Sequence, residues 1–153
     1  MRALSTSVAL IVVVAYAVLS GTWVNRHPGW YAGLGKPTWQ PPDWVFGVMW
    51  PLNFLALGVV SWLVCYRYAH GSRVLWLVVL ICSVALALTW AYLFYVPHHL
   101  QGAALALSGA ALLTWGLWAL TMRVDWLPVL ILTPYAVWMS VAATLSWAYA
   151  RLN

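Results

Sequence analysis

Long apolar stretches alternate with short polar connections along this 153-residue chain. A helix that crosses the hydrocarbon core of a bilayer needs about 20 mostly apolar residues. Stretches of that length predict membrane helices at residues 4–24, 44–66, 74–96, 102–122 and 127–150. The pattern therefore predicts an all-α, integral, multi-pass membrane protein in which residues 1–153 form a single domain, a bundle of five transmembrane helices.

The first apolar stretch has two interpretations. Arg2 and the small residues near Ser20 are features of a cleaved signal peptide. The apolar run is longer than the core of a signal peptide, however, and Trp23 at its end is typical of a side chain at the membrane surface. We therefore expect this stretch to be a membrane helix.

Composition and charge exclude several classes of protein. The chain is 65% hydrophobic and 6% charged, with a mean hydropathy of +0.88, whereas soluble domains are roughly 25% charged. The net charge is +5, but the seven basic residues are scattered and form no basic stripe, so nucleic acid is not an expected partner. These residues divide four to three between the two predicted membrane surfaces, which gives the positive-inside rule almost no signal for orientation.

Small residues recur at intervals of four in most of the predicted helices. In lipid, such stripes let helices approach each other closely, and each stripe can form either an internal seam or a dimer seam. Pro51 and Pro134 lie inside predicted helices and lack the N–H that a helix uses, so we expect both helices to bend there.

Tryptophan is unusually frequent, with thirteen residues in the chain. Those near predicted helix ends fit the aromatic belt at the membrane surface: Trp23, Trp62, Trp76 and Trp126. Others fall in the interior of the predicted bundle. Trp138 shares a helical face with Tyr135 and Leu145, and Trp90 shares one with Phe94. These rings either fill the core, which their spacing alone favours, or form the wall of a pocket for a planar ligand.

Three segments resemble one known family. The run WYAGLGKPTWQPPDWVFGVMW (residues 30–50) is similar to the signature loop and second helix of the TspO/MBR family, the tryptophan-rich sensory proteins related to the translocator protein. The run WAYLFY (90–95) resembles a third-helix motif of that family, and residues 134–153 resemble its closing segment. The resemblance implies a five-helix bundle, commonly a homodimer, with a pocket beneath a lid formed by the loop after the first helix.

The resemblance also implies ligands. Members of the family bind porphyrins, including protoporphyrin and haem, and some bind cholesterol-like lipids or benzodiazepine-site compounds. Some candidate ligand-binding residues match the pocket motifs of the family, and others are the interior aromatic residues identified from spacing. The candidates are Trp30, Tyr31, Trp39, Trp44, Phe46, Trp50, Trp90, Phe94, Tyr135, Trp138, Ala142 and Leu145. The loose cholesterol pattern Leu145–Tyr149–Arg151 is also present, although it matches many helix ends by chance.

Cations near the expected lid are candidates to hold the carboxylates of a porphyrin. Arg26 and Lys36 are the residues proposed for this role, although snorkelling at the membrane surface explains most such cations. His27, His98 and His99 lie on the same side. The adjacent pair His98 and His99 could ligate haem iron, but no helical metal-ligand spacing occurs. We expect no intrinsic metal or cofactor, and at most a bound porphyrin or haem.

The chain departs from the family pattern at four positions. Ala87 occurs where an Asn is usual, Ala106 where an acidic residue is usual, Gly102 where an aromatic residue is frequent, and Ser146 where an Asn is usual. Smaller or less polar groups at these positions predict a larger or more apolar pocket.

Catalysis by side chains is not expected. Asp43 and Asp125 are the only acidic residues, and both lie at predicted membrane surfaces, so no paired-carboxylate or triad arrangement can form. The first hypothesis is a membrane receptor, sensor or carrier for a planar hydrophobic ligand, most simply a tetrapyrrole. One alternative is light-dependent breakdown of bound porphyrin. Another is non-catalytic regulation or assembly of carotenoid or chlorophyll complexes.

Overall fold

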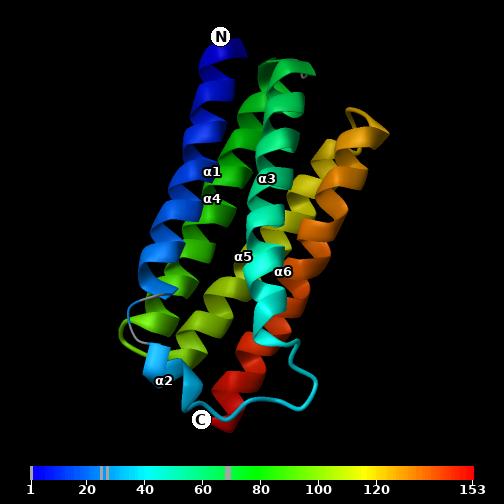
Figure 1. Cartoon of the computed structure of the whole chain (residues 1–153). Coiled ribbons are helices and arrows are strands. Elements are labelled where there is room, and N and C mark those ends of the chain that lie inside the picture. The colour runs from blue at the N-terminus through cyan, green and yellow to red at the C-terminus, as the bar shows by residue number, and fades with distance from the viewer. Residues whose placement is uncertain (1, 25, 27, 68–69) are drawn as a thin grey trace.

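The computed structural model of the chain describes residues 2–24, 26, 28–67 and 70–153. These parts are helical apart from short connections, and Figure 1 shows the helices as one elongated bundle. The elements are α1 (Arg2–Val24), α2 (Pro28–Ala32), α3 (Asp43–Arg67), α4 (His70–Tyr95), α5 (Leu100–Thr121) and α6 (Trp126–Leu152). Five of them are long and apolar enough to cross a membrane, which confirms the prediction of an all-α, multi-pass membrane protein.

The five long helices run up and down the bundle, so the two termini lie at opposite ends (Figure 1). Helix α4 packs against α1 and α5, and α6 packs against α3 and α5. The end that holds α2 and the C-terminus is called the lid end here, and the end that holds the N-terminus is called the far end. At the far end, an ion pair between Arg67 and Asp125 ties α3 to the start of α6.

The predicted helix bounds agree with the structure to within a few residues, but α2 was not predicted. This short helix lies in the connection after α1, which was expected to be a loop. The sequence carries one signal for it, since Pro28 is its first residue and proline is favoured at the first position of a helix.

Small-residue stripes on α4 and α5 form an internal seam. The hydroxyl of Ser83 donates to the carbonyl oxygen of Ala110 at 3.1 Å and lies 3.1 Å from the hydroxyl oxygen of Thr114. Ala87 and Ala110 are fully buried beside them. Close approach of these faces accounts for the tight packing of α4 on α5, so these two stripes are not available as a dimer seam.

Indole groups link neighbouring helices through hydroxyl side chains. Five tryptophans donate their Nε1–H to a serine or threonine on another helix, at 2.9–3.2 Å: Trp76 to Thr121, Trp90 to Ser146, Trp115 to Ser140, Trp118 to Thr133, and Trp147 to Ser108. An indole N–H that is removed from water needs an acceptor, and a hydroxyl oxygen supplies one in all five cases, from the fully buried Trp76 to the partly exposed Trp115.

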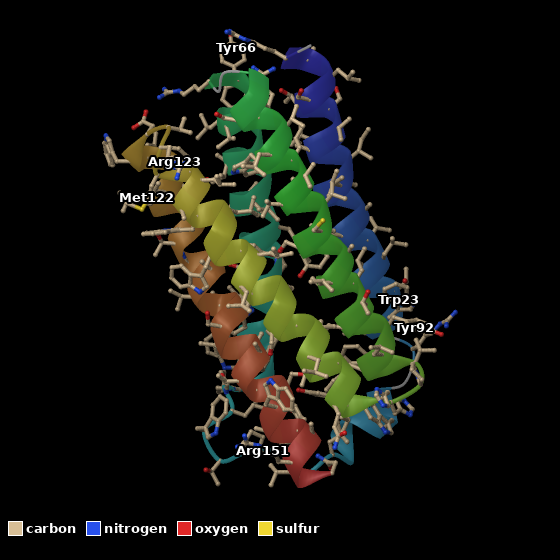
Figure 2. The ribbon with its side chains drawn as sticks, turned by 180° about the vertical axis from the view of Figure 1, so that it is seen from behind. Trp23, Tyr66, Tyr92, Met122, Arg123 and Arg151 are labelled. Carbon is tan, nitrogen blue, oxygen red and sulfur yellow. The ribbon has the colours of Figure 1, made fainter. Side chains whose placement is uncertain are left out.

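Three of the four tryptophans assigned to the belt lie near helix ends with rings that are at least partly exposed. Trp62 and Trp126 are 50% and 71% exposed. Trp23 lies near the lid end against Tyr92, with ring centroids 5.7 Å apart (Figure 2). The prediction is wrong for Trp76, which is fully buried. It lies near the start of α4, but the hydroxyl of Thr121 accepts its N–H inside the bundle.

Candidate functional site

A cavity of about 570 Å³ lies in the lid half of the bundle, between α1, α3, α4 and α6. This volume falls within the ~300–1,000 Å³ typical of small-molecule sites. Seven of the candidate residues from the sequence line it: Tyr31, Phe46, Trp50, Trp90, Phe94, Ala142 and Leu145. Residues far apart in the chain therefore converge on one space, and most of its wall is apolar or aromatic.

Two indole rings dominate the wall. Trp50 of α3 and Trp90 of α4 lie with ring centroids 6.1 Å apart and planes inclined by 24°. Phe54 continues the stack beyond Trp50 at 5.8 Å, and Phe94 lies 5.9 Å from Trp90. The indole N–H of Trp90 donates to the hydroxyl oxygen of Ser146 at 3.2 Å. This bond fixes the orientation of the Trp90 ring, so the cavity presents near-parallel flat faces.

The backbone of α3 adds a polar group to this apolar wall. Gly47 and Pro51 both line the cavity and lie four residues apart on α3. Proline has no N–H, so the carbonyl oxygen of Gly47 lacks the helical donor that another residue at position 51 would supply. Pro51 therefore leaves one helical hydrogen bond of α3 unmade beside the cavity, whose lining also includes the polar residues Ser20 and Ser146.

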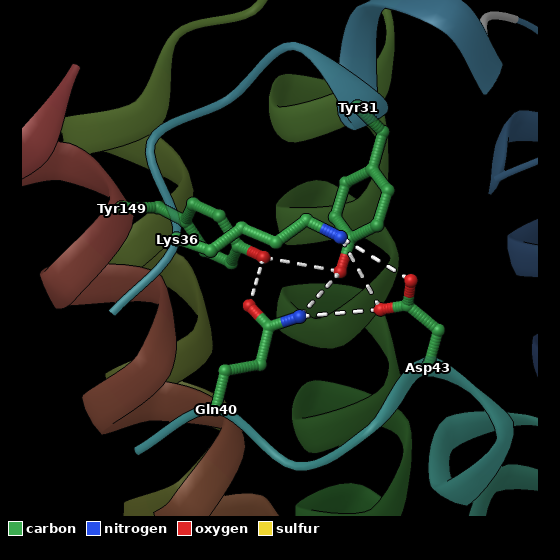
Figure 3. A network of polar contacts seen from close by, with 5 residues as sticks. All are labelled: Tyr31, Lys36, Gln40, Asp43 and Tyr149. Carbon is green, nitrogen blue, oxygen red and sulfur yellow. Dashed lines mark hydrogen bonds and ion pairs between the residues drawn. The ribbon is translucent and has the colours of Figure 1, made fainter. Parts of the chain in front are cut away.

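Polar side chains join the lid segment (residues 30–42) to α3 and α6 (Figure 3). The hydroxyl of Tyr149 donates to the amide oxygen of Gln40 and lies 3.1 Å from the hydroxyl oxygen of Tyr31. The Gln40 amide nitrogen donates to a carboxylate oxygen of Asp43 at 3.2 Å. The Nζ of Lys36 lies 3.2 Å from the other carboxylate oxygen. We call these five residues the lid network.

Two further contacts fasten the lid. The side-chain amide of Asn153 accepts a bond from the N–H of Gly35 at 2.8 Å and donates to the Gly35 carbonyl oxygen at 3.2 Å. The indole of Trp30 stacks on the imidazole of His98, with ring centroids 3.8 Å apart. The segment is therefore held to the C-terminus and to the connection between α4 and α5.

Five candidate residues do not line the cavity. Trp39 and Trp44 are 52% and 70% exposed, so they face the surroundings of the bundle. Trp30 is part of the lid and meets Phe94 edge-on at 5.5 Å. Tyr135 is buried in the central core. Trp138 lies behind Phe46, with ring centroids 5.6 Å apart, so the wall that the sequence assigned to Trp138 is formed by Trp90.

Sequence reasoning missed the contribution of α1. Tyr16, Ser20 and Gly21 line the cavity, but no motif covered the first helix. A tyrosine in the middle of an apolar span was the available signal, since its hydroxyl must find a place inside the bundle. Tyr95 was also missed, and Tyr149 was identified only as part of the loose cholesterol pattern, although both fall within segments that matched the family pattern.

The cations assigned to ligand carboxylates lie near the lid, and one is already paired. Lys36 pairs with Asp43, which itself lines the cavity mouth. The Nζ of Lys36 also lies 4.8 Å from the ring centroid of Tyr31. Arg26 is exposed at the same end. His27 lies outside the described residues.

The adjacent histidines have structural roles. The Nδ1 atom of His99 accepts a bond from the N–H of Gly102 at 3.2 Å and caps α5, while His98 stacks on Trp30. Neither histidine lines the cavity. Among the described residues, no three His, Cys, Asp or Glu side chains gather as metal ligands do.

The departures from the family pattern have separate explanations. A β-carbon at Gly102 would lie 2.3 Å from Nδ1 of His99, so the histidine cap requires glycine there. Ala87 and Ala106 are buried and do not line the cavity. Only Ser146 reaches it, where it accepts the Trp90 bond. The expectation that Ala87, Ala106 and Gly102 enlarge the pocket is therefore wrong for this cavity.

Comparison with known proteins gives a consistent result. A sequence model of the TspO/MBR family matches residues 7–152. The chain is 31% identical over 152 residues to Protein CrtK of Rhodobacter capsulatus, which covers 98% of this chain and 95% of that protein. It is 33% identical over 129 residues to the Translocator protein of Homo sapiens, covering 81% and 75%. It is 30% identical over 156 residues to the Tryptophan-rich protein TspO of Chlorobaculum tepidum, covering 98% and 95%.

Proposed function

Because this chain belongs to the TspO/MBR family of membrane proteins, we propose that it is a receptor or carrier whose cavity binds a tetrapyrrole such as protoporphyrin. The observation that carries the proposal is the pair of near-parallel indoles, Trp50 and Trp90, in the wall of an apolar cavity of about 570 Å³. Flat π faces favour flat guests, because offset stacking adds to the burial of apolar area.

The proposed ligand lies with its ring against Trp50 and Trp90 and its carboxylates towards the lid network. Lys36 is the cation nearest the mouth, and its pair with Asp43 is exposed on both sides. Exposed ion pairs contribute only ~0–1 kcal/mol, so a ligand carboxylate can replace Asp43 at little cost. Asp43 then keeps the hydrogen bond from Gln40. Arg26 supplies a second cation at this end.

The test is titration of the purified protein in nanodiscs with metal-free protoporphyrin, followed by the Soret absorption and by tryptophan quenching. We expect saturable binding. Trp50→Leu and Trp90→Leu should each weaken it by roughly fivefold, because an aromatic contact contributes ~1 kcal/mol beyond area burial. Trp44→Leu is the matched control, because Trp44 is 70% exposed and does not line the cavity. Equal affinities for all four proteins would refute the proposal.

The role of Lys36 is tested with protoporphyrin and its dimethyl ester, which has the same ring without the charges. We expect the protein to prefer the free acid, and Lys36→Gln to abolish that preference while Lys36→Arg retains it. The stacking surface is unchanged in these variants, so ester binding should persist in both. A preference that survives Lys36→Gln would transfer the role to Arg26.

The absorption spectrum of the protein purified gently from its native membrane separates the proposal from its alternatives. We expect a Soret band. A carotenoid envelope would instead favour assembly or regulation of pigment complexes. Illumination of the porphyrin-loaded protein tests breakdown, which requires a new absorbing product beyond the protein-free control.

A further inference from the structure

A second apolar hollow adjoins the cavity on the outer surface of α1 and α3. It is a groove of about 690 Å³, and its lining includes Val14, Gly58 and Trp62. Ala17 and Phe54 line both the groove and the cavity. The two hollows therefore meet at the seam between α1 and α3, on a surface that faces the bilayer.

Helices α1 and α3 contact each other in the half of the bundle towards the far end. The thiol of Cys65 donates to the carbonyl oxygen of Ser5 at 3.7 Å, and the ring of Tyr16 meets that of Phe54 at 4.9 Å. Figure 1 shows the two ribbons further apart at the lid end. There the two helices face each other across the cavity, and both contribute residues to its lining.

Small residues border this part of the seam. A β-carbon added at Gly21 of α1 or at Gly47 of α3 would meet no neighbouring atom within 4 Å. Both glycines line the cavity, together with the exposed residue Pro51. Neither position therefore carries a side chain that would obstruct the seam.

Polar contacts surround the mouth of the cavity at the lid end. The lid network and the paired bonds between Asn153 and Gly35 hold the lid segment to α3 and α6. A tetrapyrrole is mainly apolar and concentrates in the bilayer, where it reaches the α1–α3 seam without breaking any of these bonds.

We propose that the ligand moves between the bilayer and the cavity through a lateral opening at the α1–α3 seam, bordered by Gly21 and Gly47. The proposal rests on the proposed function, because it specifies the route to that site. The ligand is then a molecule already dissolved in the bilayer, and it enters parallel to the membrane plane with the edge of its ring leading.

The first experiment measures association and dissociation rates of metal-free protoporphyrin in nanodiscs by stopped-flow fluorescence. Gly21→Leu and Gly47→Leu narrow the opening. Leucine is a better helix former than glycine, so folding is not at risk. We expect kon to fall by about tenfold, because a barrier on the route slows entry, whereas koff also reflects the contacts that the new side chain makes inside the cavity. Gly29→Leu, in α2, is the matched control, because a β-carbon there also meets no atom within 4 Å.

Two results of this experiment would overturn the proposal. In the first, kon is unchanged and koff rises, which would mean that the leucine only takes up space in the cavity and does not block the route. Passage through the lid would be revealed if Gln40→Ala raised both rates while Gly21→Leu left kon at the wild-type value.

A second experiment needs no porphyrin and so separates this proposal from the proposed function. In a Cys82→Ser background, a bimane fluorophore is attached at Gly47→Cys, and quenching by a phospholipid with dibrominated acyl chains is measured. An open seam predicts quenching close to that at Val48→Cys, because Val48 is 48% exposed. Quenching as weak as at Ser146→Cys, deep in the cavity, would overturn the proposal. If the wild type binds no porphyrin, the proposed function fails, and this measurement still decides whether the seam is open.

Discussion

Replacement of Thr121 by valine removes the acceptor of the Trp76 indole N–H while nearly preserving the shape of the side chain. Both residues are fully buried, and the donor and acceptor atoms are 3.1 Å apart. The hydroxyl of Thr121 also donates to the carbonyl oxygen of Leu117 at 2.7 Å. The substitution therefore leaves a buried indole N–H without an acceptor, whereas the Leu117 carbonyl keeps its place in the helix.

The size of the effect follows from the surroundings of the bond. Hydrogen bonds between membrane helices contribute ~0.6 kcal/mol on average and reach ~1.7 kcal/mol. The bond between Trp76 and Thr121 is excluded from solvent and has good geometry. We therefore expect a coupling free energy of about 1–1.5 kcal/mol in a double-mutant cycle with Trp76→Phe, close to a tenfold change in the unfolding equilibrium.

The assay is equilibrium unfolding in mixed micelles with increasing sodium dodecyl sulfate, followed by the helical circular dichroism signal. The matched control pairs Trp76→Phe with Thr133→Val, since Thr133 accepts from Trp118 instead. This control pair should be additive to within ~0.3–0.5 kcal/mol. A coupling between Trp76 and Thr121 no larger than that of the control pair would refute the reasoning.

Three further predictions concern the cavity and its lid end. Ser146→Ala should weaken protoporphyrin binding by roughly three- to tenfold, measured by Soret titration, because the Trp90 ring loses the bond that orients it; an unchanged Kd would show that the bond has no such role. Gly102→Ala should lower the free energy of unfolding by about 1–2 kcal/mol, because the new methyl group displaces the His99 cap. In a His99→Ala background, where the cap is already lost, Gly102→Ala should change the free energy of unfolding much less. Asp43→Asn should tighten binding of the free acid but not of the dimethyl ester, because it removes a negative charge at the mouth; equal effects on both would contradict this.

The long helices were predictable from sequence because in a bilayer every backbone group must be bonded within its own segment. Apolar length therefore reports helix position directly, and the predicted bounds of the span containing Trp90 differ from α4 by at most a few residues. The short helix α2 escaped prediction, because five residues at the lid end carry no such length signal.

The site was predictable where a motif placed residues on a face and unpredictable where packing between helices decided the outcome. Trp50 and Phe46 reach the cavity as expected. Trp138 and Trp90 were equally good candidates by spacing, and only the rotation of α4 and α6 about their axes places Trp90 in the wall. Helical periodicity defines a face, but it does not say which neighbour that face will meet.

Tyr16 shows the same limit for α1. Its position within an apolar span indicated burial, yet nothing in the sequence said which rings it would meet. The structure places it edge-on to Phe54 and beside the cavity. That placement depends on the approach of α1 to α3, which the sequence does not encode in any local pattern.

The indole–hydroxyl bonds are distributed unevenly, and this has a mechanical consequence. All five join members of the α4–α5–α6 group, so that group behaves as a stiff frame whose members cannot slide without losing directional bonds. Helix α1 meets α3 mainly through rings and methyl groups, as in the contact of Tyr16 with Phe54, and such contacts tolerate small displacements. A tilt of α1 would therefore leave the frame, and the Trp90 face that it carries, in place.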